Sequence, residues 1–153
     1  MEQRVLAPHS LLATYYRTAL LLGLARGDDV HRWAERVIEV EHDPPKALFE
    51  IVSVAADDLT GLRHALWPLV VEPDPPAVIE AILGVLYADL LGERRTFEDT
   101  LAILRQMRGL LRLPPETYAQ LNATLVTYAT SQQQHVIAGW LDRFAQSRIE
   151  ESQ

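Results

Sequence analysis

The sequence of 153 residues contains no cysteine and a single lysine, Lys46. The absence of cysteine excludes disulfides, thiol catalysis and cysteine-ligated metals. A domain of this size needs no disulfides, so the composition fits a reducing compartment, and we expect a cytoplasmic protein. Lys46 stands beside a proline pair at an expected helix start. That is a poor setting for Schiff-base catalysis, which requires a desolvated amine.

Long hydrophobic runs are also absent. The most apolar stretch, residues 19–25, is far shorter than the roughly 20 residues that a membrane-spanning helix needs. The N-terminus lacks the charged start and long apolar run of a signal peptide. Residues 75–91 are apolar too, but they contain Glu80 and Asp89, and we interpret them as a buried core helix. We therefore expect no membrane partner.

Catalytic and nucleotide-binding signatures are missing as well. The sequence has no Gly-x-Gly-x-x-Gly, no phosphate-binding loop ending in Gly-Lys-Ser/Thr, no His-Glu-x-x-His and no Gly-x-Ser-x-Gly. We assign no catalytic residue and expect no cofactor. These absences favour a binding protein over an enzyme.

Charge is unevenly distributed along the chain. The net charge is -7, yet residues 28–99 hold 16 acids and 6 bases, a local balance of -10. Nucleic-acid backbones need clustered cations, so this acidic middle argues against a nucleic acid and favours a basic protein surface as partner. A solvated surface without any partner is the plainer explanation. The partner-binding residues that we predict stand at helix starts and turns: Asp57, Asp58, Glu72 and Asp74.

Apolar residues recur every three or four positions along nearly the whole chain, while strand-like alternation is absent. This pattern predicts a single all-α domain over residues 1–153, with seven or eight helices. Proline pairs at 44–45, 75–76 and 114–115 open helices and divide the chain into four helical hairpins. We expect the hairpins to stack in a small α-solenoid-like array, with a globular helical bundle as the alternative.

Individual residues mark several helix ends. Gly27 is expected to end a first helix over residues 10–26, and Pro68 must end or kink the fourth. Thr96 and Asp99 have the spacing of a capping pair at the start of the sixth helix. No glycine or proline separates the last two helices, so they could be continuous. We expect all three tryptophans in the core: Trp33, Trp67 and Trp140.

One stretch resembles known sequences. His31-Arg32-Trp33-Ala34-Glu35-Arg36-Val37-Ile38 is followed by Asp43-Pro44-Pro45, then by Leu48-Phe49-Glu50-Ile51 and Ser53. This stretch resembles a group of uncharacterised bacterial helical proteins, in which a Trp-Ala…Ile helix leads into a Pro-Pro turn and a short apolar helix with an internal Glu. The resemblance implies a helical fold and a bacterial source. It implies no activity and no functional residues.

A stripe of His and Glu on the second helix, expected over residues 29–42, is the sharpest chemical candidate. At about 100° per residue, four side chains fall within an arc of roughly 80°: His31, Glu35, Glu39 and His42. The last two have the Glu-x-x-His spacing of bundle metal sites, and a ligand from another helix could complete a zinc site. Ordinary charge pairs on a solvated face are the plainer explanation. In that case, alanine at either histidine changes neither stability nor metal content.

Two further polar features are candidates. Asp89 lies on the apolar side of the helix expected over residues 77–91, and we expect Arg63 or Tyr15 to be its partner. Five arginines around the sixth helix could bind an anion, because guanidinium groups match carboxylate and phosphate geometry. Pairing with the chain's own acids is the alternative for this cluster: Arg94, Arg95, Arg105, Arg108 and Arg112.

Two functional hypotheses follow. The first is a non-enzymatic protein-binding domain, either immunity- or antitoxin-like or an adaptor, which binds a basic partner through an acidic face. The second is a helical bundle that binds a metal or small ligand through the His/Glu stripe of residues 29–42. Metal analysis of the purified protein discriminates between them.

Overall fold

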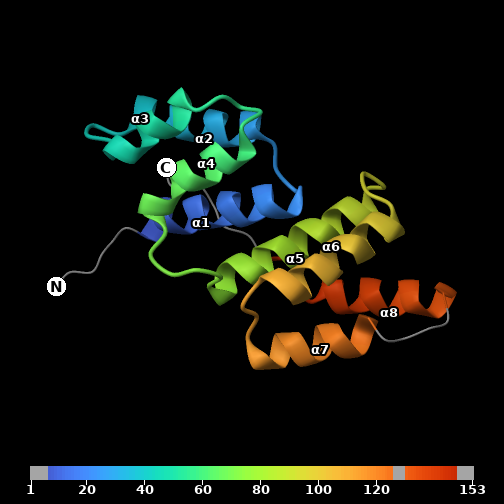
Figure 1. Ribbon diagram of the computed structural model, residues 1–153. Helices are drawn as coiled ribbons and strands as arrows, with labels where there is room; N and C mark the ends of the chain where they lie inside the picture. The colour runs from blue at the N-terminus through green and yellow to red at the C-terminus, as the bar shows by residue number, and fades with distance from the viewer. Residues whose placement is uncertain (1–6, 126–129, 148–153) are drawn as a thin grey trace. The chain divides into compact units, whose positions relative to one another are not determined.

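The computed structural model describes residues 7–125 and 130–147, in which helices are joined by turns and short irregular segments (Figure 1). These residues form eight α-helices and one 3-10 turn, without a strand. The expectation of an all-α fold is confirmed. Contacts divide the chain into two compact units, separated between Pro73 and Asp74. The division into compact units does not show whether each unit folds by itself. The single domain over residues 1–153 therefore stays a prediction.

The first unit contains four helices and the 3-10 turn: α1 (Ala7–Leu22), α2 (Gly27–Val40), α3 (Lys46–Ser53), α4 (Leu59–Leu66) and η1 (Trp67–Leu69). Helix α2 packs against α3, α3 against α4, and α1 against α4 and η1. Its core comes from apolar residues spaced three or four apart on each helix. The largest fully buried side chains of this unit are Trp33, Leu48, Ile51, Leu62 and Leu66.

The second unit contains α5 (Pro76–Leu91), α6 (Phe97–Leu110), α7 (Pro115–Leu125) and α8 (Thr130–Asp142). Helix α5 packs against α8 and α6, while α7 packs against both α6 and α8. Helix α5 is the central helix of this unit, as its composition predicts, because seven of its 16 residues are buried. The last two helices are separate elements, although residues 126–129 between them lie outside the described part. No helix among the described residues has the length and apolar character needed to cross a membrane.

The hairpin order expected for the first unit needs correction. The main neighbours of α1 are α4 and η1, whereas its backbone lies farther from α2. Bulky aromatic rings account for this spacing, because Tyr16 of α1 and Trp33 of α2 meet with ring centroids 5.4 Å apart. Large side chains between two helices hold their axes apart, and small ones allow close approach.

The glycine predicted to end α1 has a different role. The helix ends at Leu22, and Gly23 adopts a φ of 77°, the left-handed conformation of a helix C-terminus. Gly27 instead begins α2 and is buried. A Cβ at this position would overlap the carbonyl oxygen of Ala56 and lie 2.9 Å from its Cα. Gly27 is therefore required for close packing between α2 and the chain that follows α3.

The predicted ends at Thr96 and Pro68 are confirmed. The Thr96 hydroxyl accepts a hydrogen bond of 3.0 Å from the backbone N–H of Asp99, which caps α6. Helix α4 ends at Leu66, and the chain passes through η1, which contains Pro68. Proline cannot donate the backbone hydrogen bond that would continue the helix.

The tryptophan predictions are confirmed at two positions and wrong at the third. Trp33 and Trp140 are buried, with exposed fractions of 0% and 6%, whereas Trp67 is 51% exposed. Trp67 follows α4 with a helical backbone conformation, and it continues the outer face of that helix rather than the face with the buried Leu62 and Leu66. The Arg17 guanidinium lies 4.6 Å from the centroid of the Trp67 ring and covers part of it.

Two glycines should be irreplaceable by alanine for steric reasons. Gly27→Ala would force Ala56 to move. In Gly84→Ala on α5, the new Cβ would overlap the Phe144 carbonyl oxygen and lie 2.9 Å from the Ser147 carbonyl oxygen. We expect each to destabilise the fold by about 1–3 kcal/mol, the usual range for overpacking. Gly139→Ala in α8 is the matched control, because its Cβ would meet nothing within 4 Å. It should raise stability by up to about 1 kcal/mol through helix propensity.

Urea unfolding of the three variants measures these free energies. An equally stable Gly27→Ala protein would show that α2 does not approach the backbone of Ala56 this closely.

Candidate functional site

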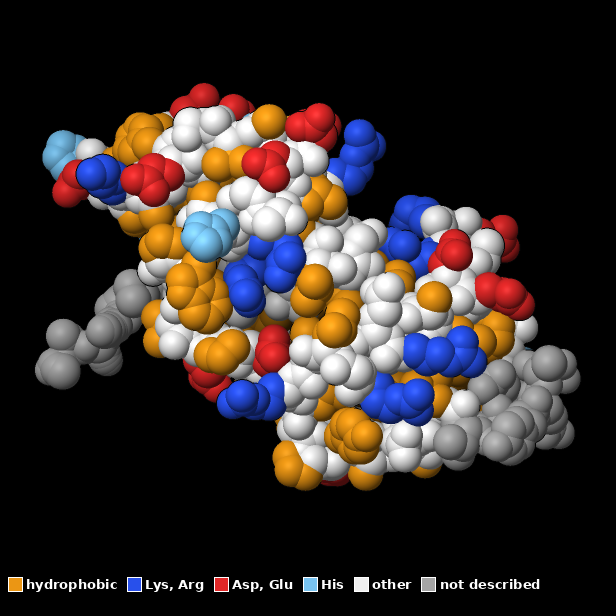
Figure 2. Space-filling view, viewed as in Figure 1, with side chains coloured by type: hydrophobic (Ala, Val, Ile, Leu, Met, Phe, Trp, Pro, Cys, Tyr) orange, Lys and Arg blue, Asp and Glu red, His pale blue; other side chains and the backbone are white. Residues whose placement is uncertain are grey.

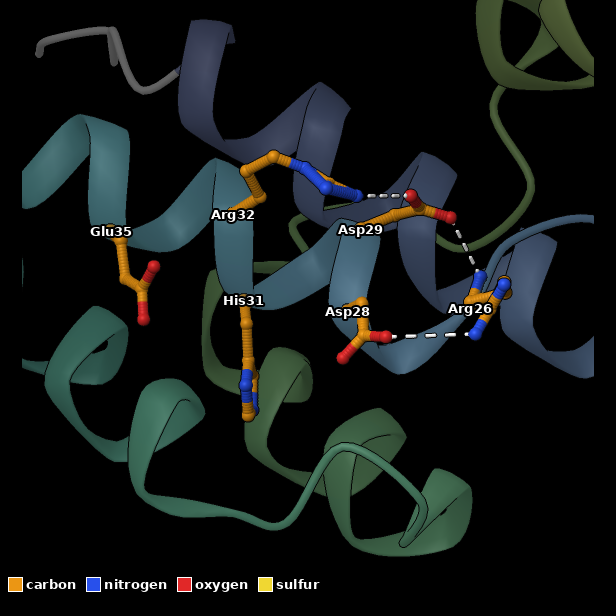
Figure 3. Close-up of a pocket in the computed structure, with 6 residues that line it drawn as sticks. All are labelled: Arg26, Asp28, Asp29, His31, Arg32 and Glu35. Carbon is orange, nitrogen blue, oxygen red and sulfur yellow. Dashed lines mark hydrogen bonds and ion pairs between the residues drawn. The ribbon is translucent and has the colours of Figure 1, made fainter.

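A polar pocket lies at the N-terminal end of α2 (Figure 3). Every side chain that lines it comes from α2 or from the residue just before that helix, and all are charged or ionisable: Arg26, Asp28, Asp29, His31, Arg32 and Glu35. The pocket includes two members of the predicted His/Glu stripe, His31 and Glu35. It is therefore the place to test whether the stripe forms a binding site.

Asp29 organises the start of α2. Its carboxylate accepts a 2.9 Å hydrogen bond from the backbone N–H of Arg26 and a 2.8 Å hydrogen bond from Nη2 of Arg32. The Arg26 guanidinium lies 3.7 Å from the Asp28 carboxylate. An acid in the first helical turn also interacts favourably with the exposed N–H groups there. Two arginines and two aspartates around the pocket thus neutralise one another (Figure 3).

These contacts set the protonation of Asp29. Partial burial raises the pKa of its carboxyl, but the hydrogen bonds from Arg26 and Arg32 and the charges of both arginines lower it further than burial raises it. The net pKa is lowered from the ordinary value of 3.8. Asp29 is therefore an anchored carboxylate that caps its helix, with the properties of a structural residue.

His31 links two helices. Its Nε2 lies 2.6 Å from the carbonyl oxygen of Val54, the C-cap residue just after α3. A carbonyl can only accept, so Nε2 carries the hydrogen and donates it. The bond ties the middle of α2 to the C-terminus of α3 and occupies one ring nitrogen. Nε2 is then not available to a metal.

The stripe members farther along the chain, Glu39 and His42, form no metal site with His31. Helix α2 ends at Val40, two residues before His42, so the expected helix over residues 29–42 is too long. Glu39 is the last helical member of the stripe, and both Glu39 and His42 are exposed. In the described part of the chain, no three His, Asp or Glu side chains lie where they could hold a metal ion together.

The four predicted partner-binding acids have unequal roles. Asp57 and Glu72 are exposed in the first unit. Asp58 is exposed too, but its carboxylate caps α4 by accepting a 2.9 Å hydrogen bond from the N–H of Gly61. Asp74 belongs to the second unit, where it has a φ of 50° and accepts a 2.8 Å hydrogen bond from the N–H of Arg112. Asp58 and Asp74 thus also stabilise the fold.

The arginine cluster is partly neutralised within the second unit. Arg94 and Arg95 lie 3.1 Å and 3.0 Å from the carboxylate of Asp89. The expected partners of Asp89, Arg63 and Tyr15, are therefore wrong. The reason is local, because the chain turns back just after α5 at Gly92 and Glu93, and brings both arginines to Asp89.

The other three arginines of the cluster lie farther along the chain. Arg108 donates a 3.0 Å hydrogen bond to the side-chain carbonyl of Asn122 on α7. Arg105 and Arg112 are exposed. Three of the five arginines thus have partners within the chain, and anion binding by the whole cluster stays a prediction.

A hydrogen bond in the second unit had no signal in the sequence. The Tyr87 hydroxyl of α5 donates to the carboxylate of Asp142 at the end of α8, and this bond raises the pKa of Tyr87. Desolvation and the negative charge of Asp142 act in the same direction. The pair joins two helices that already pack together.

The sequence interpretation also missed a second pocket in the first unit, lined by Arg17, Thr60, Arg63, His64 and Trp67. Four of these residues have the spacing i, i+3, i+4 and i+7, which places them along one face of α4 and its continuation into η1. That spacing was the available signal. The expectation that Trp67 lies in the core is inconsistent with this face, which is exposed at His64 and Trp67.

Comparison of the chain with models of protein families, with curated proteins and with solved structures found no significant match.

Replacing His31 should now destabilise the protein, contrary to the expectation from the helical wheel. His31→Ala removes the bond to Val54, and we expect a loss of about 0.5–1.5 kcal/mol in the free energy of unfolding. His42→Ala is the matched control, because His42 is exposed and lies outside the helix. It should change stability by less than about 0.5 kcal/mol. Equal unfolding midpoints in urea for both variants would remove the structural role of His31.

The lowered pKa of Asp29 gives stability a defined pH dependence. A carboxyl whose pKa is lower in the folded state stabilises the protein above its unfolded pKa, near 3.8. This contribution is lost as the pH falls through the lower, folded-state pKa. Asp29→Asn should therefore be less stable than the unmodified protein at pH 7, and the difference should shrink below pH 3.8. Denaturant unfolding across this range measures it, and a constant difference at all pH values would contradict the assignment.

Proposed function

We propose that this protein is a non-enzymatic binding module that recognises a basic protein through the outer surface of α2 and α3. We name this surface the α2–α3 acidic face and define it by exposed residues of the two helices and the turn between them: Glu35, Glu39, Val40, Glu41, Asp43, Phe49 and Glu50. The observation that carries the proposal is the combination of exposed acids with exposed apolar side chains on this hairpin.

Charge favours a basic partner. Residues 27–58 contain nine acids and three bases, a balance of -6. Eight of the nine acids are exposed, and Asp29 is the half-buried exception. Figure 2 shows acidic side chains over the α2 and α3 region. Surfaces of one sign steer oppositely charged partners and raise association rates by about 10- to 1,000-fold.

The acidic face also exposes apolar side chains, which contribute hydrophobic contacts that charge alone does not supply. Val40 at the end of α2 is 66% exposed, and Phe49 on α3 is 49% exposed. Aromatic side chains are enriched at the centres of protein interfaces, while charged residues form the solvated rim. A basic surface with an apolar patch would therefore complement this hairpin better than a uniformly charged polymer would.

Two biological roles suit such a module. An immunity- or antitoxin-like protein masks a basic partner, and an adaptor joins two proteins without chemistry of its own. The missing catalytic motifs support both, and the absence of cysteine supports a cytoplasmic location. The resemblance of residues 31–53 to bacterial helical proteins supports a bacterial source.

The test reverses charge at exposed acids and leaves out the acids for which a hydrogen bond or ion pair is described above. Asp58, Asp74 and Asp29 are avoided because they hold hydrogen bonds, and Glu41 is avoided because His9 lies 3.7 Å from it. The test variant carries lysine at three exposed acids of the acidic face: Glu39, Asp43 and Glu50. The control variant has the same change of net charge at three exposed acids of the second unit: Glu80, Glu93 and Glu98.

A partner captured from the host is purified, and its association rate is measured at 0.01 M and 0.15 M salt, where the Debye length falls from about 30 Å to about 8 Å. The rate should fall with salt for the unmodified protein and for the control variant. The test variant should associate at least about tenfold more slowly at low salt. Phe49→Ala should instead speed dissociation. An acidic partner, an association rate indifferent to salt, or equal losses in both charge variants would overturn the proposal.

A further inference from the structure

The second pocket of the first unit combines positive charge with an exposed aromatic ring. Its lining residues, Arg17, Thr60, Arg63, His64 and Trp67, come from α1, α4 and η1. Helix α1 packs against α4 and η1, so these side chains belong to one rigid group of helices. Figure 2 shows Lys or Arg side chains next to a His side chain over the region of α1 and α4.

The electrostatic setting of this pocket is opposite to that of the acidic face. Residues 3–27 and 59–71 contain no Asp or Glu, although the whole chain carries a net charge of -7. No acid therefore lies on α1, α4 or η1, and none is among the described residues that line the pocket. Arg63 and His64 also stand in the last turn of α4, where cations are favoured by the exposed carbonyl groups.

An independent observation indicates a missing acceptor. The Nε atom of Arg63 is buried and has no hydrogen-bond partner among the described residues. A buried donor without an acceptor costs stability, and such groups are rare in folded proteins. Cations at a helix end are explained by the helix alone, but this orphaned donor is not. An anion in the pocket would supply the acceptor.

The donors suit a phosphate group better than a carboxylate. The Arg63 guanidinium, the His64 imidazole and the Thr60 hydroxyl offer hydrogen bonds from three side chains, and Arg17 adds positive charge beside them. A phosphate monoester presents three terminal oxygens to them, whereas a carboxylate presents two. Arginine forms paired hydrogen bonds to phosphate, which adds geometric selectivity.

The Trp67 ring favours a phosphate that is attached to a planar group. It is 51% exposed at the edge of the pocket, and the Arg17 guanidinium stacks on it at 4.6 Å. Aromatic rings stack favourably on planar groups, and such contacts strengthen binding independently of charge. We propose that this pocket binds a phosphate monoester of a planar aromatic group, as a second site separate from the acidic face.

The probes are phenyl phosphate, inorganic phosphate, benzoate and phenol, each titrated into the full chain in 0.15 M sodium chloride. Tryptophan fluorescence reports binding, because Trp33 and Trp140 are buried and Trp67 is the exposed tryptophan. Phenyl phosphate should give a saturable change and bind tighter than inorganic phosphate or benzoate, and phenol should give none. Absence of saturation at millimolar phenyl phosphate, or tighter binding of benzoate, would overturn the proposal.

Substitutions locate the site by calorimetry with phenyl phosphate. Arg63→Gln should weaken binding at least about tenfold, because a hydrogen bond to a charged group is lost. His64→Asn should weaken it in the same direction and serves as the second variant if Arg63→Gln does not fold. Trp67→Ala should remove the advantage of phenyl phosphate over inorganic phosphate. The matched control is Arg105→Gln on α6, an exposed arginine outside the pocket.

The control also separates this pocket from the arginines of the second unit. Unchanged affinity in Arg105→Gln, with loss in Arg63→Gln and His64→Asn, supports the pocket. Loss in Arg105→Gln with normal binding by both pocket variants would place the anion on α6 and overturn the proposal. The small probes need no protein partner, so this outcome is independent of the proposed function.

Discussion

The architecture of the first unit depends on a close approach between α2 and the chain that follows α3. Gly27 makes it possible, because any Cβ there would overlap the Ala56 carbonyl. The approach places Nε2 of His31 against the carbonyl of Val54, so the end of α3 gains a hydrogen-bond donor. It also buries Trp33 among the apolar residues of neighbouring helices. The outer surface of the hairpin, with its exposed acids, is presented on this rigid base.

Opposite charges are separated within the first unit, and both proposals follow from that separation. Among its described residues, every acid except Glu72 belongs to α2, α3 and the turns beside them, while α1, α4 and η1 carry none. Mutual neutralisation occurs inside the hairpin at the start of α2, where Asp29 binds Arg26 and Arg32. Farther along α2 and α3, the acids are exposed. The two surfaces can therefore bind ligands of opposite charge without competing for the same side chains.

Local chemistry made the helices predictable. A repeat of apolar residues every three or four positions commits the chain to helix, because only that spacing gathers them on one face. Proline pairs open α5 and α7, and Pro68 stops α4, since the ring lacks the N–H that a helix interior needs. The cap of α6 by Thr96 was predictable for the same reason, as both partners lie within one turn. Each of these features depends on residues no more than four positions apart.

The functional surfaces depended on contacts between distant residues, and there the sequence was insufficient. By itself it determined that the chain is helical, where most helices begin and end, and that its middle is acidic. Only the tertiary structure decided that His31 bonds to Val54, that Gly27 packs on Ala56, and that Trp67 faces solvent beside Arg17. Helical periodicity reports which face of one helix is apolar, but not which backbone or charge meets that face. Such contacts are set by packing between helices, and they join residues that are 23 to 50 positions apart in the sequence.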